Sequence, residues 1–187
     1  TTAASSLTLI GTSAGAGVIT AAANGTVAIG TQALTSLTEG VANIAIGYQA
    51  MQEHTTGVNN IAIGYQAMDK TGHGACPESV GNIFIGKNAG GGIWSTNDCN
   101  YNMGIGNHVM SAVMNDANYN IAFGHNVLPA LTTGNYNLAI GSGAGVAITT
   151  GGSNILLGTG AGDLIVGSDN NVCVGIDAGN VITNGAG

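Results

Sequence analysis

Short apolar segments recur along the whole chain, and a glycine closes each of them. These glycines are Gly11, Gly30, Gly47, Gly64, Gly86, Gly106, Gly124, Gly141, Gly158 and Gly175. Successive glycines lie 19, 17, 17, 22, 20, 18, 17, 17 and 17 residues apart. A fixed period with occasional insertions is typical of a solenoid, in which each repeat forms one rung. We number the rungs 1 to 10 by their closing glycines and count positions within a rung from that glycine.

The apolar positions inside the repeat predict a β-strand. Position −1 is large and apolar in every rung, and position −3 is apolar in every rung except the first, which has Thr8. These two positions lie two residues apart, so on a strand their side chains share one face. Because β-branched residues suit a packed strand face, we predict that this face lines the core of the solenoid.

The residue between them, at position −2, is mostly small and would point to the opposite face. A face in contact with solvent would be polar, but this column is apolar as well. We therefore predict that another subunit covers it. The predicted subunit interface consists of Ala28, Ala45, Ala62, Ala122 and Ala139.

Asparagine occupies position −4 in eight rungs and predicts a stacked ladder. Stacked Asn amides can bond to one another from rung to rung. Rungs 1 and 2 carry Leu7 and Thr26 at this position, so the ladder is predicted to begin at rung 3. Its members are Asn43, Asn60, Asn82, Asn102, Asn120, Asn137, Asn154 and Asn171.

Together these columns predict an all-β protein. We expect a parallel β-solenoid or β-roll of about ten 17-residue rungs that occupies residues 1–187 as a single repeat domain, intertwined or packed as a homotrimer. Position +3 is always Ala or Val, which marks a second packed column after the bend. Polar turns such as Thr55 to Gly57 return the chain to the next rung.

Charge is scarce and mostly negative. Only 6% of the residues are charged, and Lys70 and Lys87 are the only Lys or Arg residues in a chain of net charge −7. This balance excludes nucleic-acid binding through phosphate neutralisation and attraction to anionic membranes. No apolar run is long enough for a membrane-spanning helix, so no membrane insertion is expected. The chain begins without an initiator methionine or a secretory signal, which indicates a processed product or a segment of a longer fibre.

Two successive runs resemble a known repeat. Asn43 to Met51 reads Asn-Ile-Ala-Ile-Gly-Tyr-Gln-Ala-Met, and Asn60 to Met68 has the same sequence. The pattern resembles the repeat of phage tail fibres and is similar to the head of trimeric autotransporter adhesins. The adhesin resemblance implies a left-handed parallel β-roll of three chains around one axis. The unit here is longer than the adhesin unit, and the sequence shows no adhesin neck or anchor, which favours the viral-fibre branch.

The two longest intervals contain two of the three cysteines. Cys76 and Cys99 hold nearly equivalent loop positions in adjacent rungs, which a rung spacing of about 5 Å would bring within reach of a disulfide. The loop insertions could equally carry the two thiols apart. A bond would imply an oxidising, extracellular setting. Cys173 lies in the small apolar column and is expected to be a buried free thiol.

The same insertions gather the residues best suited to recognition. Loops on a rigid scaffold commonly carry binding residues. The alternative is an irregular loop that packs on itself. The residues predicted to form surface-contact loops are Lys70, His73, Glu78, Lys87, Trp94, Asp98 and Tyr101.

The sequence predicts no catalytic, cofactor-binding or metal-binding residue, and we expect that the protein is not an enzyme. His54, His73, His108 and His125 do not share one column, and the nine acidic residues are scattered over loops. We expect these carboxylates to keep an apolar fibre soluble.

The function expected from the sequence is that of a structural fibre or adhesin segment in a phage or virus-like appendage. Its partners would be two sister chains, other appendage proteins, and a host surface glycan or protein contacted by the loops. The alternative is an extracellular filament subunit that stacks head to tail, because neither terminus shows a polar cap. A monomeric ice-binding solenoid would need a flat threonine array, and the threonines here fall in turns without one consistent column.

Overall fold

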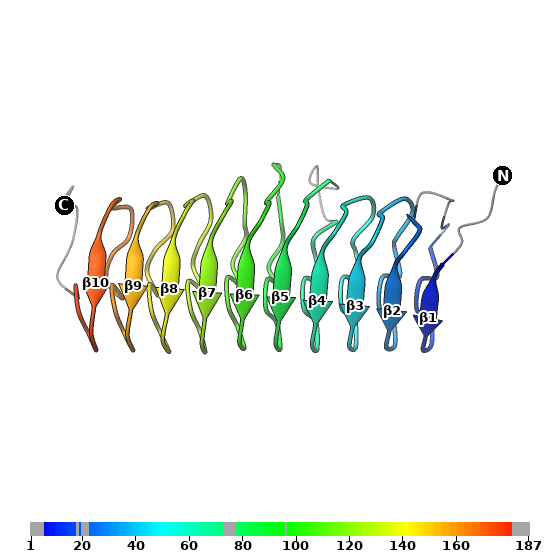
Figure 1. Ribbon diagram of the computed structural model, residues 1–187, viewed down its shortest axis with the longest axis horizontal. Helices are drawn as coiled ribbons and strands as arrows, with labels where there is room; N and C mark the ends of the chain where they lie inside the picture. The colour runs from blue at the N-terminus through cyan, green and yellow to red at the C-terminus, as the bar shows by residue number, and fades with distance from the viewer. Residues whose placement is uncertain (1–5, 18, 20–22, 73–77, 96, 181–187) are drawn as a thin grey trace.

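The protein is an all-β parallel solenoid of about nine turns, with a repeat of about 17 residues. The computed structural model describes residues 6–17, 19, 23–72, 78–95 and 97–180. One parallel sheet contains its ten strands in chain order (Figure 1). The strands are β1 (Thr8–Ile10), β2 (Val27–Ile29), β3 (Ile44–Ile46), β4 (Ile61–Ile63), β5 (Ile83–Ile85), β6 (Met103–Ile105), β7 (Ile121–Phe123), β8 (Leu138–Ile140), β9 (Ile155–Leu157) and β10 (Val172–Val174). Each strand is the predicted apolar segment before a closing glycine, so the predicted all-β parallel solenoid is confirmed, whereas the homotrimer stays a prediction.

Equivalent residues of all rungs stay in register, although the repeats differ in length. Ile61 pairs with Ile83 across the 22-residue interval, and Ile83 pairs with Met103 across the 20-residue interval. Both intervals add their extra residues between the closing glycine of one rung and the strand of the next. The strands therefore form an even wall, and variation is confined to the loops.

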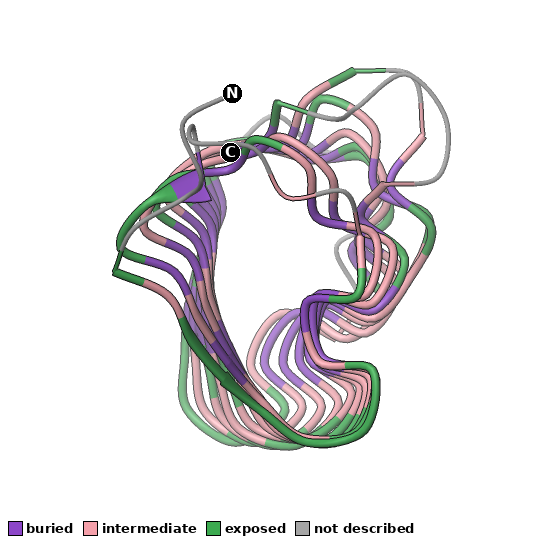
Figure 2. Cartoon of the chain, turned by 90° about the vertical axis from the view of Figure 1, so that its right-hand side faces the viewer, coloured by how far each residue is buried: buried purple, intermediate pink, exposed green. Residues whose placement is uncertain are grey.

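The structure reverses the predicted inner and outer faces of the strands. Position −2 points into the solenoid, and Ala28, Ala45, Ala62, Ala122 and Ala139 are all fully buried within a single chain. Positions −3 and −1 lie on the outside of the wall, with the buried residue between them (Figure 2). The prediction that the alanine column forms a subunit interface is therefore wrong. Both faces are apolar, so polarity alone could not distinguish them, and the larger side chains lie outside.

A size compensation inside most rungs explains why the inner column is small. Position +4 is buried Leu or Met in rungs 2, 3, 4, 6 and 7, where position −2 is Ala or Gly, as in the pair Ala62 and Met68. Rung 8 has small residues at both positions, and side chains of rungs 7 and 9 fill the space: a Cβ on Gly145 would lie 2.7 Å from Leu128. Where position −2 is large, position +4 is Gly: a Cβ on Gly90 would lie 2.9 Å from the Phe84 ring, and one on Gly162 would lie 2.7 Å from Leu156. The two positions thus share one narrow core at close-packed density.

The asparagine ladder is confirmed, and it is buried. Asn60 shows the repeated geometry: its side-chain amide donates to Asn43 Oδ1 at 3.2 Å and to the Ser79 carbonyl at 2.8 Å. Its backbone N–H also donates to Asn43 Oδ1, at 2.9 Å. Every amide is thereby satisfied, as burial requires. The pattern runs through Asn82, Asn102, Asn120, Asn137, Asn154 and Asn171.

Thr26 extends this network one rung beyond the predicted start. Its hydroxyl donates to the Gly40 carbonyl at 3.1 Å and accepts the Asn43 backbone N–H at 3.4 Å. These are the roles that an asparagine plays in the later rungs. A threonine at position −4 therefore ends the amide ladder without leaving its last backbone group unpaired.

The closing glycine is required by the stacking of the rungs. Gly47 has a φ of 135°, and a Cβ there would collide with the carbonyl oxygen of Gly64 in the next rung. Residues with side chains avoid this backbone region, so only glycine permits this bend at this spacing.

Candidate interaction surface

A continuous apolar stripe covers the outside of the sheet. We define the stripe as positions −3 and −1 of strands β2 to β9, none of which is buried. Exposure reaches 40% at Ile105 and 38% at Ile140. Its residues are Val27, Ile29, Ile44, Ile46, Ile61, Ile63, Ile83, Ile85, Met103, Ile105, Ile121, Phe123, Leu138, Ile140, Ile155 and Leu157. Most of these residues are half-buried and four are exposed, and a contiguous, partly exposed apolar surface of this length is typical of a protein–protein interface.

Two stacks of tyrosines flank the stripe at different levels. Tyr48 and Tyr65 follow β3 and β4, with ring centroids 5.2 Å apart. Tyr101, Tyr119 and Tyr136 precede β6, β7 and β8, with centroids 5.2 and 5.1 Å apart. All five rings are exposed and stack at the spacing of the rungs. Tyrosine is enriched at interfaces because its ring is apolar and its hydroxyl remains wet.

The predicted surface-contact residues do not all reach the surface. Lys70, Glu78, Lys87 and Tyr101 are exposed, and Asp98 is half-buried. They belong to rungs 4 to 6. His73 lies outside the described residues. The placement of the exposed residues agrees with a contact role, which stays a prediction.

Trp94 is a core residue, so its predicted surface role is wrong. The side chain is fully buried, and its Nε1–H donates to the Gly90 carbonyl at 3.1 Å. Its ring meets the Phe84 ring edge-on, with centroids 5.9 Å apart. The insertion turns inward at this point because the indole fills the core and its N–H finds a backbone acceptor there.

The cysteines are only partly placed. Cys76 lies outside the described residues, so the predicted disulfide with Cys99 stays a prediction. Cys99 is buried, and its backbone N–H donates to Ser79 Oγ at 3.0 Å. Cys173 is a buried free thiol, as predicted, and burial raises its pKa.

His54 and Thr71 form a buried polar pair inside the core. His54 Nδ1 lies 3.0 Å from Thr71 Oγ1, and Nε2 lies 3.1 Å from the Gly57 carbonyl oxygen. Because a carbonyl only accepts, Nε2 carries the proton and Nδ1 accepts from the threonine hydroxyl. Desolvation lowers the pKa of His54 to about 4, although the bond to Gly57 opposes this shift. The imidazole is therefore neutral at pH 7.

Asp69 shows the opposite shift nearby in the chain. Burial raises the pKa of this carboxyl group to about 6, while the positive charge of Lys70 lowers the pKa and the negative charge of Glu53 raises it further. Lys70 is thus matched with an acidic neighbour in its own chain. His108 and His125 lie on the outside of the coil, with ring centroids 6.3 Å apart.

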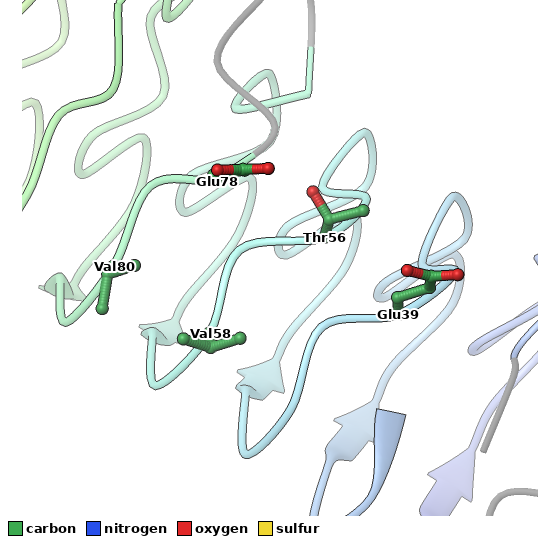
Figure 3. A pocket seen from close by; sticks show the side chains of 5 residues that line it. All are labelled: Glu39, Thr56, Val58, Glu78 and Val80. Atoms are coloured by element: carbon green, nitrogen blue, oxygen red, sulfur yellow. The ribbon is translucent and has the colours of Figure 1, made fainter. Parts of the chain in front are cut away.

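A shallow pocket of about 370 Å³ lies beside the entrance to strands β3 to β5. Its lining combines two carboxylates, one hydroxyl and two apolar side chains. Figure 3 shows Glu39, Thr56 and Glu78 in one row on successive rungs, with Val58 and Val80 in a second row nearer the strands. The pocket thus presents negative charge above an apolar floor.

Within the part of the chain that the structure describes, no three His, Cys, Asp or Glu side chains converge on a possible metal position. The same residues include no helix that is long and apolar enough to span a membrane. Comparison with family models, curated proteins and solved structures finds no match for this chain. The apolar stripe and the pocket are therefore the features from which a function can be argued.

Sequence reasoning missed the two features for different reasons. The stripe residues are large and were therefore assigned to the core. The pocket is lined by positions −8 and −6, whose residues change from rung to rung and so show no uniform column. The signal that could have revealed the stripe is the size compensation between positions −2 and +4, since only side chains that share a core compensate.

Proposed function

We propose that this chain forms the shaft of a homotrimeric fibre in a phage or virus-like appendage outside the cell. In this assembly the apolar stripes of three chains face one another along the fibre axis. The loops between the strands contact a host surface glycan or protein where the assembly leaves them exposed. The chain contributes stiffness and reach and catalyses no reaction.

The apolar stripe is the observation that carries this proposal. It runs along eight strands, and each rung adds about 4.8 Å to its length. A chain with 6% charged residues has few means to keep such a surface soluble alone. Burying it between copies would supply the hydrophobic stabilisation that the surface forgoes in a single chain. The repeat resembles trimeric fibre proteins, which supports three copies over two.

The oligomeric state tests the proposal. Sedimentation velocity of the wild-type chain should give one species of about three times 18.2 kDa. Replacing Ile63 with Glu places a charge in the centre of the stripe, so the variant should sediment as a folded monomer. Leu164→Glu is the matched control, because Leu164 is 52% exposed and lies outside the stripe. This control should remain a trimer.

Three results would count against the assembly. A monomeric wild-type chain, or an Ile63→Glu variant that remains a trimer, contradicts it directly. Open-ended polymers whose length grows with concentration would instead favour the head-to-tail filament. Circular dichroism of each variant separates loss of assembly from loss of the fold.

A further inference from the structure

Lys87 is the unmatched cation of the described chain. It is exposed and directly follows Gly86, which closes strand β5. The structure shows no ion pair for it among the described residues, whereas Lys70 lies in the field of Asp69. In a chain of net charge −7, copies that approach one another repel, so a cation without a partner in its own chain is available to a neighbour.

The pocket of Figure 3 has the chemistry that a lysine side chain requires. Lysine lays its four-carbon stem on apolar surface and keeps its ammonium group near water and negative charge. Val58 and Val80 offer the apolar floor, and the carboxylates of Glu39 and Glu78 lie beside it. Both carboxylates are exposed, and the described residues include no cation that pairs with either.

Lys87 and this pocket lie on opposite edges of the same sheet face. Glu78 and Val80 precede strand β5, and Lys87 follows it, so the strand separates them. A rotational assembly of identical chains brings one edge of each copy against the other edge of the next. An axis parallel to the solenoid also holds equal rungs at equal height. Glu78 of one copy and Lys87 of the next therefore share one level, because both belong to rung 5.

We propose that the side chain of Lys87 from a second copy of this chain occupies the pocket, with its ammonium group paired to Glu78 and its stem on Val58 and Val80. The inference rests on the proposed homotrimer and adds its register. Hydrophobic stripes slide easily past one another, because neighbouring rungs look alike. One charge pair at one level selects a single alignment out of many.

A crosslinking experiment on the wild-type chain tests this contact. Unlabelled and ¹⁵N-labelled chains are unfolded together, refolded, and treated with a water-soluble carbodiimide. This reagent condenses a carboxylate with an amine that touches it, forming an amide with loss of water. Mass spectrometry should find Lys87 joined to Glu78 in peptides that combine one labelled and one unlabelled half. Lys87 joined to another carboxylate, or only same-label products, would overturn the proposal.

Matched neutralisations provide the second measurement. Lys87→Gln and Glu78→Gln should each raise the concentration at which half of the chains are trimeric by roughly tenfold, the size of a partly buried charge-assisted pair. Lys70→Gln removes the same charge elsewhere and should leave that concentration within about threefold of wild type. Exchanging the charges in the double variant Glu78→Lys, Lys87→Glu should restore assembly.

The two proposals fail differently. A trimer that is indifferent to Lys87→Gln and Glu78→Gln overturns the proposed contact and leaves the fibre assembly intact. A wild-type chain that sediments as a monomer overturns both.

Discussion

His54 and Thr71 interrupt an otherwise aliphatic column in the core. The equivalent position of other rungs holds Leu37, Leu131 and Ile148, all fully buried. The imidazole and the hydroxyl satisfy each other, and Gly57 accepts the remaining proton. The cost of this arrangement is a dependence on pH, because the site accommodates only neutral imidazole.

We expect stability to fall on acidification because of His54. Its pKa is 6.5 in the unfolded chain and about 4 in the fold, so the unfolded chain binds more protons between these values. The stability from neutral His54 is therefore present above pH 6.5 and is lost as the pH falls toward 4. Asp69 acts in the opposite direction, because its raised pKa stabilises the fold as the pH falls through 6.

Urea unfolding at pH 7 and pH 5 isolates the histidine. The double variant His54→Leu, Thr71→Val keeps Asp69 and removes the polar pair. Its free energy of unfolding should rise relative to wild type by about 2 kcal/mol between pH 7 and pH 5, from 1.36 kcal/mol for each unit of pKa difference. The exposed His125→Leu should show no such change. An equal pH response of wild type and the double variant would contradict the role of His54.

The size compensation between positions −2 and +4 leads to a second prediction, which concerns the strand and the stretch that faces it. Ala62→Leu overpacks the core and should lower the free energy of unfolding by about 1 to 3 kcal/mol. Met68→Gly leaves a cavity and should also destabilise, by roughly 2 to 5 kcal/mol. The double variant reproduces the Leu156 and Gly162 pair and should lose at least 1 kcal/mol less than the sum of the two losses. Additive losses, measured by denaturant unfolding, would show that the two positions do not share space.

Most of the strand-level structure was predictable from the sequence, but the inner and outer faces, Trp94 and the pocket were not. The ten strands, their boundaries and the asparagine ladder follow from columns that repeat, because each rung must satisfy the same backbone bonds. The assignment of inside and outside failed because Ala62 and Ile63 are both apolar, and size was read as burial. Trp94 lies in an insertion, which occurs once and forms no column, and the pocket is lined by positions −8 and −6, whose residues change from rung to rung.

For the whole molecule, the central question is whether the fold and the assembly melt together. Binding that occurs only in the folded state stabilises it by mass action. The midpoint of thermal unfolding of the wild-type chain should therefore rise by several degrees over a hundredfold increase in concentration. The monomeric Ile63→Glu variant should melt at a midpoint that does not depend on concentration. A wild-type midpoint that is equally constant would indicate a solenoid that folds without partners.

The constant register of the strands has a consequence for length. Rungs of 17 and of 22 residues add the same length along the axis, since their strands pair residue by residue with those of the neighbouring rungs. Length is therefore counted in whole repeats, at about 4.8 Å each, and is independent of how many residues a repeat contains. Duplication or loss of a repeat changes reach in fixed steps, whereas loops can diversify without altering it. Each repeat thus adds a fixed length to the solenoid, and each repeat can carry a loop of different sequence.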